Sequence, residues 1–154
     1  MDDLAARIEA FLDAYHVMTL ATVGDSAAHA ASLMYARKGF VLCWTSDPQS
    51  RHSLHLVREA RITATVAPDY TDFRVIRGLQ IAGRARRLDV DAEAEEARAL
   101  LVGRYDFLAA LASGPPALRA AFEKAAFYAL VPERITLIDN ARGFGHKETL
   151  TLAP

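Results

Sequence analysis

The sequence predicts a single α+β domain over residues 1–154, in which antiparallel strands curl into a small barrel. Three observations lead to this fold class. Short apolar segments alternate with turn residues through the first half of the chain, which is typical of a strand meander. A stretch rich in alanine, glutamate, leucine and arginine follows and has helical character, and apolar residues with strand character return after it. Helices at the ends and in one insertion indicate the α+β class, and about six strands favour a barrel.

The first half of the chain is expected to hold an opening helix, four strands and a second, short helix. Residues 3–14 place Leu4, Ile8, Phe11 and Leu12 on one stripe, which is the spacing of an amphipathic helix. Glycine, aspartate and proline then separate the apolar segments, because these residues favour turns. The strands expected in this half cover residues 16–23, 28–36, 40–45 and 62–67.

A short helix is expected over residues 50–59, between the third and fourth strands. Ser50 is of a residue type that commonly caps the N-terminus of a helix. Leu54 and Val57 are then expected to face inward.

The longest strand candidate covers residues 75–88, with apolar residues such as Leu79 and Ile81 at odd positions. Gly78 and Gly83 interrupt it, which indicates a bulge, a bend or the close approach of another backbone. The rest of the chain is expected to form helices over 91–111 and 116–126, then strands over 127–130, 134–138 and 149–152.

Composition narrows the classes of partner. With 52% hydrophobic residues in 154, the chain suits one domain with a substantial core. Its net charge of -1 gives no basic field for nucleic acid or an anionic membrane, so a small molecule or a protein is the expected partner. The single cysteine, Cys43, excludes an internal disulfide, and no apolar run approaches the ~20 residues of a membrane helix. A cytoplasmic location is expected.

Residues 44–56, "WTSDPQSRHSLHL", combine hydroxyls and basic groups at the start of the short helix. The free N–H groups of its first turn and the positive end of its dipole would point toward Ser50, Arg51 and His52. Arginine adds a charge-assisted contact to a phosphate, and Thr45 and Ser46 at the end of the preceding strand would add donors. The sequence therefore predicts an anion site. In the competing interpretation Ser50 is only an N-cap and Arg51 is solvated.

Other residues considered for ligand binding, metal binding or catalysis have weaker support from the sequence. Arg77 has the parity of the apolar face of its strand, and an inward arginine needs an anionic partner, unless it snorkels to water at the barrel end. His52 and His55 have helical spacing, but there is no HExxH or CxxC pattern, so no metal site is expected. There is also no GxSxG nucleophile motif.

The order of these parts resembles the pyridoxamine 5'-phosphate oxidase-like family of FMN-binding split barrels. In that family a strand ends in an aromatic or apolar residue and threonine, and a loop then leads to a serine and two basic residues that open a helix. Trp44-Thr45 and Ser50-Arg51-His52 occupy those places, and "IRGLQIAGRARRL" matches the later long strand. The C-terminal segment "RITLIDNARGFGHKETL" resembles a poorly characterised subgroup of this superfamily.

The resemblance implies a six-stranded antiparallel split β-barrel with flanking helices, a homodimer, and one FMN per site at the dimer interface. The phosphate would contact Thr45 and the Ser50–His52 segment, the strand over 30–34 would run beside the isoalloxazine ring, and Gln80 would substitute for a flavin contact near Gly78. The implied cofactor-binding residues are Ala30, Ala31, Ser32, Leu33, Trp44, Thr45, Ser50, Arg51, His52, Arg77, Gly78 and Gln80.

Two departures from the family pattern matter. Members that oxidise pyridoxamine phosphate carry a lysine near Tyr35 and a tryptophan and an arginine near the C-terminus, whereas the only tryptophan here is Trp44. That vitamin-salvage activity is therefore not expected. His52 stands where the family has a permanently charged residue, so one phosphate contact should depend on pH.

The leading hypothesis is an FMN-dependent oxidoreductase that acts on an unidentified small-molecule substrate or electron donor, with the cofactor performing the chemistry. No catalytic side chain is assigned, and Arg142, His146 and Lys147 are the cations expected near the ring or substrate. One alternative is a non-catalytic protein that binds or senses flavin, deazaflavin or haem. Its candidate axial haem ligands are His16, His29 and His146. The other alternative is a structural dimer with an empty cleft, in which Arg51 and Arg77 pair with acids.

Overall fold

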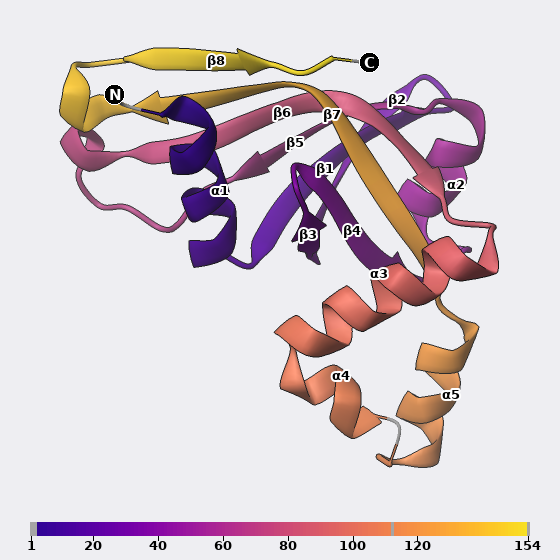
Figure 1. Ribbon diagram of the computed structural model, residues 1–154. Coiled ribbons are helices and arrows are strands. Elements are labelled where there is room, and N and C mark those ends of the chain that lie inside the picture. Colours follow the sequence, from indigo (N-terminus) through magenta and orange to yellow (C-terminus); the bar gives the residue numbers. More distant parts are fainter. Residues whose placement is uncertain (1–2, 112, 154) are drawn as a thin grey trace.

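The computed structural model describes residues 3–111 and 113–153, and Figure 1 shows a curled antiparallel sheet with helices around it. Two short 3-10 helices, η1 and η2, lie in loops. The elements in chain order are α1 (Leu4–Ala14), β1 (Val17–Gly24), β2 (Ala27–Met34), β3 (Ala36–Lys38), β4 (Val41–Ser46), α2 (Arg51–Arg58), β5 (Arg61–Val66), η1 (Phe73–Val75), β6 (Arg77–Arg87), α3 (Asp91–Arg104), α4 (Asp106–Leu111), α5 (Pro116–Lys124), β7 (Ala126–Asp139), η2 (Asn140–Arg142) and β8 (Lys147–Thr151).

The strands form one sheet with the order β2-β1-β5-β6-β7-β4-β3. The first part of β7 pairs with β4, and its last part pairs with β8. The sheet curls until β2, at one edge, and the end of β4 both reach α2, as the contacts of His52 with Ser46 and His29 show. The α+β class and the split barrel are therefore confirmed. The described residues contain eight strands, so the expected number of six is wrong.

One difference from the expected strands is a corner at Tyr35. The expected strand over 28–36 divides there, because the Tyr35 side chain is fully buried and its hydroxyl lies 2.9 Å from the Leu12 carbonyl oxygen and 2.8 Å from that of Tyr15. β2 ends before this corner, and β3 begins after it at the opposite edge of the sheet.

Residues 126–139 form one strand, β7, although the proline-containing segment 131–133 was expected to divide it. The pairing of β7 with β6 shifts by one residue at Gly83, which lies opposite Pro132. A β-bulge accommodates proline, since the ladder of backbone hydrogen bonds is locally disrupted there. The expected interruption at Gly83 is confirmed as a bulge with a close backbone approach.

The variant Gly83→Ala is expected to lose about 1–3 kcal/mol of stability, because the added methyl group overpacks the bulge. A Cβ there would lie 2.2 Å from the Val131 carbonyl oxygen and 2.8 Å from the Pro132 Cα. Thermal unfolding followed by circular dichroism measures the loss. The control is Gly103→Ala in α3, where a Cβ meets no neighbouring atom within 4 Å and helix propensity improves. Equal melting temperatures for Gly83→Ala and the unmodified protein would contradict the expectation.

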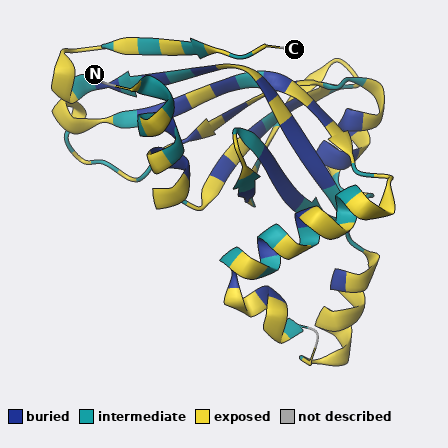
Figure 2. Ribbon diagram, viewed as in Figure 1, coloured by how far each residue is buried: buried dark blue, intermediate teal, exposed yellow. Residues whose placement is uncertain are grey.

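The main core fills the concave side of the sheet, where Figure 2 shows buried positions along the strands. α1 contributes Ile8, Phe11 and Leu12, as its stripe predicted. Trp44 is fully buried there and stacks on Tyr128 with ring centroids 5.7 Å apart.

The helix α2 turns a polar face toward the sheet. Leu54 is 47% exposed and Val57 is 84% exposed, so their expected inward orientation is wrong. Hydroxyl groups of Thr22 and Ser46 face the helix and give its imidazoles hydrogen-bond partners. These hydrogen bonds offset the free-energy cost of burying polar side chains. The buried residues of α2 are His52, Ser53, His55 and Leu56.

The helical insertion α3–α5 packs on β3 and β4 through a second cluster of buried residues. The single helix expected over 91–111 breaks at Tyr105, whose hydroxyl turns inward and donates to the Tyr35 carbonyl oxygen. In the described part of the chain, no helix is long and apolar enough to cross a membrane.

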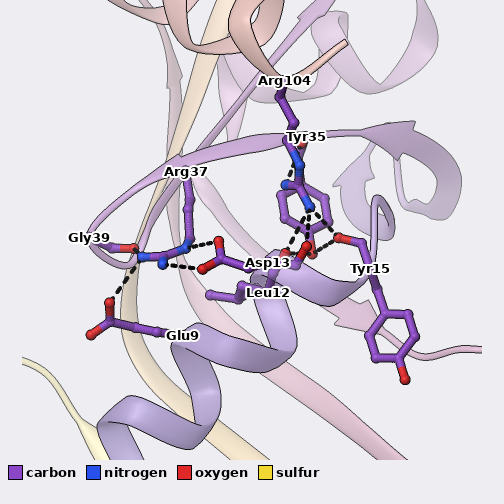
Figure 3. Close-up of polar contacts among 8 residues, drawn as sticks. All are labelled: Glu9, Leu12, Asp13, Tyr15, Tyr35, Arg37, Gly39 and Arg104. Atoms are coloured by element: carbon purple, nitrogen blue, oxygen red, sulfur yellow. Dashed lines mark hydrogen bonds and ion pairs between the residues drawn. The ribbon is translucent and has the colours of Figure 1, made fainter.

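Arg104, the last residue of α3, ties the insertion to the end of α1 and to the corner after β2 (Figure 3). Its guanidinium donates to the carbonyl oxygens of Tyr35 at 2.9 Å, Leu12 at 3.0 Å, Asp13 at 3.3 Å and Tyr15 at 2.6 Å. Burial raises the pKa of Tyr35 to about 12, so its hydroxyl stays protonated as a donor.

Beside it, Arg37 of β3 forms a two-pronged ion pair with the Asp13 carboxylate, with both N–O distances 2.6 Å, and also contacts Glu9 at 3.1 Å (Figure 3). The hydrogen bonds from Arg37 hold the pKa of Asp13 below its usual value. These contacts fasten α1 to β3.

Candidate functional site

The N-terminus of α2 lies just after β4, and Ser50 holds the expected N-cap position. Its hydroxyl does not bond to the helix backbone; it lies 2.8 Å from the Asp47 carbonyl oxygen and 2.7 Å from Ser53 Oγ. The first N–H groups of any α-helix lack partners within the helix. At α2 they therefore remain available to an acceptor from outside.

Arg51 begins α2 and is exposed. Among the described residues none forms a hydrogen bond or an ion pair with its guanidinium. Arg58, at the other end of the same helix, pairs with Asp25 at 3.0 Å. The start of α2 therefore presents an unneutralised cation beside free N–H groups, which is the arrangement of an anion site.

His52 is buried beside this helix start. Its Nε2 lies 2.9 Å from Ser46 Oγ and 3.2 Å from Ser50 Oγ. The ring stacks on His29 of β2, with centroids 6.4 Å apart and an angle of 3° between the planes. Burial, and then the neighbouring imidazoles of His29 and His55, lower the pKa of His52 below 6.5. An anion at this position would favour the protonated ring and reverse that shift.

His29, His52 and His55 together form a histidine cluster between β2 and α2. His55 Nδ1 lies 2.9 Å from Thr22 Oγ1, and its ring contacts His29 edge-on at 5.9 Å. Within the described residues, no group of three histidine, cysteine or acidic side chains is placed to hold a metal ion. The sequence indicated His29 only as a candidate haem ligand. Its contact with α2 arises from the curl of the sheet, and no local sequence pattern indicates that contact.

The expected cofactor-binding residues divide into two groups. The first lies at or near α2: the strand segment over 30–33 follows His29, and Ser46, which follows Thr45, reaches His52. Thr45 Oγ1 already donates to the Ala126 carbonyl oxygen at 3.0 Å. The Trp44 ring is sealed in the core, so only its main chain remains for a ligand.

The second group is Arg77, Gly78 and Gln80, at the start of β6. The α2 end of β4 lies near the opposite end of β6, because Thr45 pairs with Phe127 and its neighbour Tyr128 pairs with Arg87. Arg77 is ten positions and Gln80 seven positions from Arg87, which corresponds to about 33 Å and about 23 Å of strand. Within one copy of the chain, Arg77, Gly78 and Gln80 therefore lie far from the start of α2.

Arg77 pairs with an acid of its own chain, as the interpretation without a ligand expects. Its Nε lies 3.8 Å from Asp139, whose carboxylate is buried and also lies 3.7 Å from Arg142. Nearby, Glu148 contacts His146 at 3.3 Å and Arg7 at 2.8 Å. The hydrogen bonds from Arg7 lower the pKa of Glu148 to about 2. Arg142 and His146, expected near a substrate, thus contact acids of their own chain.

Comparison with known proteins bears on this site. The family described as pyridoxamine 5'-phosphate oxidase matches residues 4–138. The chain belongs to this family. The chain is also 30% identical over 149 residues to a UPF0306 protein of Klebsiella pneumoniae (strain 342), across 96% of the chain and 92% of that relative.

Solved structures share the family fold at low sequence identity. A heme binding protein of Mycobacterium smegmatis superposes with a TM-score of 0.74 at 20% identity, over 98% of this chain and 60% of that one. An FAD-binding protein of Mesorhizobium loti gives 0.64 at 21% identity, over 85% of this chain and 91% of that one. The family expected from residues 44–56 and from β6 is thereby confirmed, and the fold includes proteins described as binding flavin and proteins described as binding haem.

Proposed function

We propose that this member of the pyridoxamine 5'-phosphate oxidase family binds FMN at the start of α2 and acts as a flavin-dependent oxidoreductase on a small molecule. The observation that carries the proposal is Arg51, an exposed guanidinium without an acid partner among the described residues, beside the free N–H groups of α2. Bound FMN would accept a hydride or electrons, and the protein would supply binding and orientation.

The residues at the start of α2 fit a phosphate. Arg51 would supply the charge-assisted contact, Ser50 a hydroxyl, and the first turn its N–H groups. β2 is an edge strand, so the backbone groups of 30–33 that point away from β1 remain available to the polar edge of a flavin. Residues of the chain thus hold both ends of the cofactor, and none is required as an acid or a base.

We also propose a homodimer, on the basis of two neighbouring rows of side chains on the outer face of the sheet that carry a single charge, that of Arg134. Exposed or half-buried hydroxyl and amide side chains form a row across six strands, and the next row is mostly alanine and threonine. Strand spacing and rise give these two rows an area of roughly 400 Å², about half of the ~800 Å² that a stable interface buries on each partner, so neighbouring side chains would contribute the rest. The row consists of Ser32, Thr19, Thr65, Gln80, Thr136 and Thr149.

A dimer through this face would let the start of β6 in one copy complete the site at α2 of the other. Light scattering is expected to give twice the chain mass of 16.8 kDa. Thr65→Arg, which introduces a charge at the centre of the row, is expected to give monomers that bind FMN more weakly. A monomeric unmodified protein that binds FMN tightly would exclude this arrangement.

The proposed function is tested by titrating the purified protein with FMN and recording the visible spectrum, then adding reduced nicotinamide. A perturbed flavin spectrum that bleaches supports the oxidoreductase. Perturbation without bleaching by any donor favours the binding-protein alternative. That alternative gains from the likeness to the M. smegmatis heme binding protein, so a haemin titration belongs beside the first. An unperturbed FMN spectrum would defeat the proposal.

Affinity for FMN is expected to rise as the pH falls from 8 to 6.5, by no more than about tenfold per pH unit for one proton. His52 is neutral at pH 8 because burial and the neighbouring imidazoles lower its pKa, and a phosphate favours the imidazolium, so binding takes up a proton. Below a pH of about 6 the phosphate itself gains a proton, so the rise in affinity should not continue below that pH.

Fluorescence titrations at several pH values measure this dependence. His52→Lys should flatten it, and riboflavin, which has no phosphate, should show none in the unmodified protein. The same slope for riboflavin and FMN would contradict a role for His52 at the phosphate.

A further inference from the structure

A cavity of about 250 Å³ lies between α3 and the outer side of β3, β4 and β7. It shares no residue with the start of α2, where Ser46, Ser50 and His52 gather. Figure 1 shows α3 close to the ends of β4 and β7. The residues that line the cavity come from α3 on one side and from the strands of the barrel on the other. This cavity is independent of the proposed flavin site.

The walls of the cavity are apolar. The Cys43 thiol lies among them, 4.0 Å from the Ala97 carbonyl oxygen, and burial raises its pKa to about 11, so it stays uncharged. The aliphatic side chains come from the barrel and from the helix. They are Val41, Leu88, Ala97, Leu100 and Val131.

The charges at the rim neutralise one another. Lys38 of β3 pairs with Glu96 of α3, and Arg86 of β6 pairs with Glu93 at 2.9 Å. Both ion pairs join the helix to the barrel across the mouth of the cavity. No charge of the rim is left to recognise an ionic ligand, so the cavity favours an uncharged one.

We propose that this cavity is a second ligand site, for a compact uncharged molecule with an aromatic or aliphatic body. Apolar cavities of about 150 Å³ bind benzene, so the larger volume here accommodates one or two fused rings. The volume falls below the ~300 to 1,000 Å³ typical of drug-sized ligands, which excludes flavin and haem.

The small size of Ala97 keeps the cavity open. Ala97 lines the cavity and is buried on the face of α3 that meets the barrel. An apolar ligand in the cavity would contact both α3 and the barrel and hold them together. Binding should therefore raise the melting temperature, because only the folded protein has the site.

Indole, a neutral two-ring compound, serves as the probe. In a titration of methyl-labelled protein followed by NMR, the methyl signals of Val41, Leu88, Leu100 and Val131 are expected to shift. Those of Val17 and Val23, which are exposed on β1 and do not line the cavity, should stay in place. The melting temperature should rise with the indole concentration. FMN affinity should not change, which separates this proposal from the proposed function.

Ala97→Leu fills the cavity and is expected to weaken indole binding at least tenfold. Ala99→Leu places the same side chain at an exposed position of α3 and should bind like the unmodified protein. The mapping on the unmodified protein remains decisive if Ala97→Leu does not fold. Absence of shifts at millimolar indole, shifts centred elsewhere, or undiminished binding by folded Ala97→Leu would each overturn the proposal.

Discussion

The variant Arg104→Ala is expected to lose about 3–5 kcal/mol of unfolding free energy, because hydrogen bonds to a charged group contribute about 1.5–3 kcal/mol each and water replaces only some of them. Four carbonyl oxygens accept from this side chain, and they come from α1, from the segment after it and from the corner after β2. For a chain of this size the melting temperature should fall by roughly 10 °C.

Two comparisons isolate the effect of the planar guanidinium. Arg104→Lys keeps the charge but cannot reach several carbonyls at once, so it should recover only a small part of the stability. Arg98→Ala removes an arginine from the same helix that contacts the Phe122 ring at 4.7 Å, and it should cost much less. If Arg104→Ala melted within 2 °C of the unmodified protein, these carbonyls would be satisfied by other means.

The variant Arg51→Ala is expected to weaken FMN binding about 10- to 100-fold, the loss of one charge-assisted contact to a phosphate. Its melting temperature should stay unchanged, since the side chain is exposed and no described residue forms a hydrogen bond or an ion pair with its guanidinium. Fluorescence quenching of FMN on binding gives the affinity directly.

Arg58→Ala is the matched control, because it removes the same charge from the far end of α2. It should change FMN affinity by less than about threefold, since exposed charges that far away are largely screened. Equal losses in both variants would mean that α2 acts only through its overall charge. Unchanged affinity in Arg51→Ala would remove the basis of the proposed phosphate site.

Much of the fold was predictable because its signals are local. The stripe of α1 and the alternation in β5 and β6 depend on which side of one element is buried, and periodicity reports this directly. The same reasoning failed for α2, where the residues that face inward are mostly polar. An apolar pattern alone places Leu54 and Val57 in the core. Only the opposing hydroxyls of Thr22 and Ser46 explain why histidines lie there instead.

The site was predictable in part for the same reason. Ser50 and Arg51 follow one another in the chain, so a helix start alone brings them together. The contact of His29 with His52 depends on the curl of the whole sheet, and the strand break at Tyr35 depends on carbonyls of α1. Such features are set by residues far away in the sequence, and no short pattern encodes them.

The position of β4 has a consequence for the order of events during synthesis. Its sheet neighbours are β3 and β7, and β7 is among the last strands to leave the ribosome. Until then the apolar segment Val41–Ser46 has only the short β3 beside it. Pairings that link distant parts of a chain slow folding and prolong the exposure of strand edges. The nascent chain therefore depends on its last quarter to protect an aggregation-prone edge, and premature termination there should leave an insoluble product.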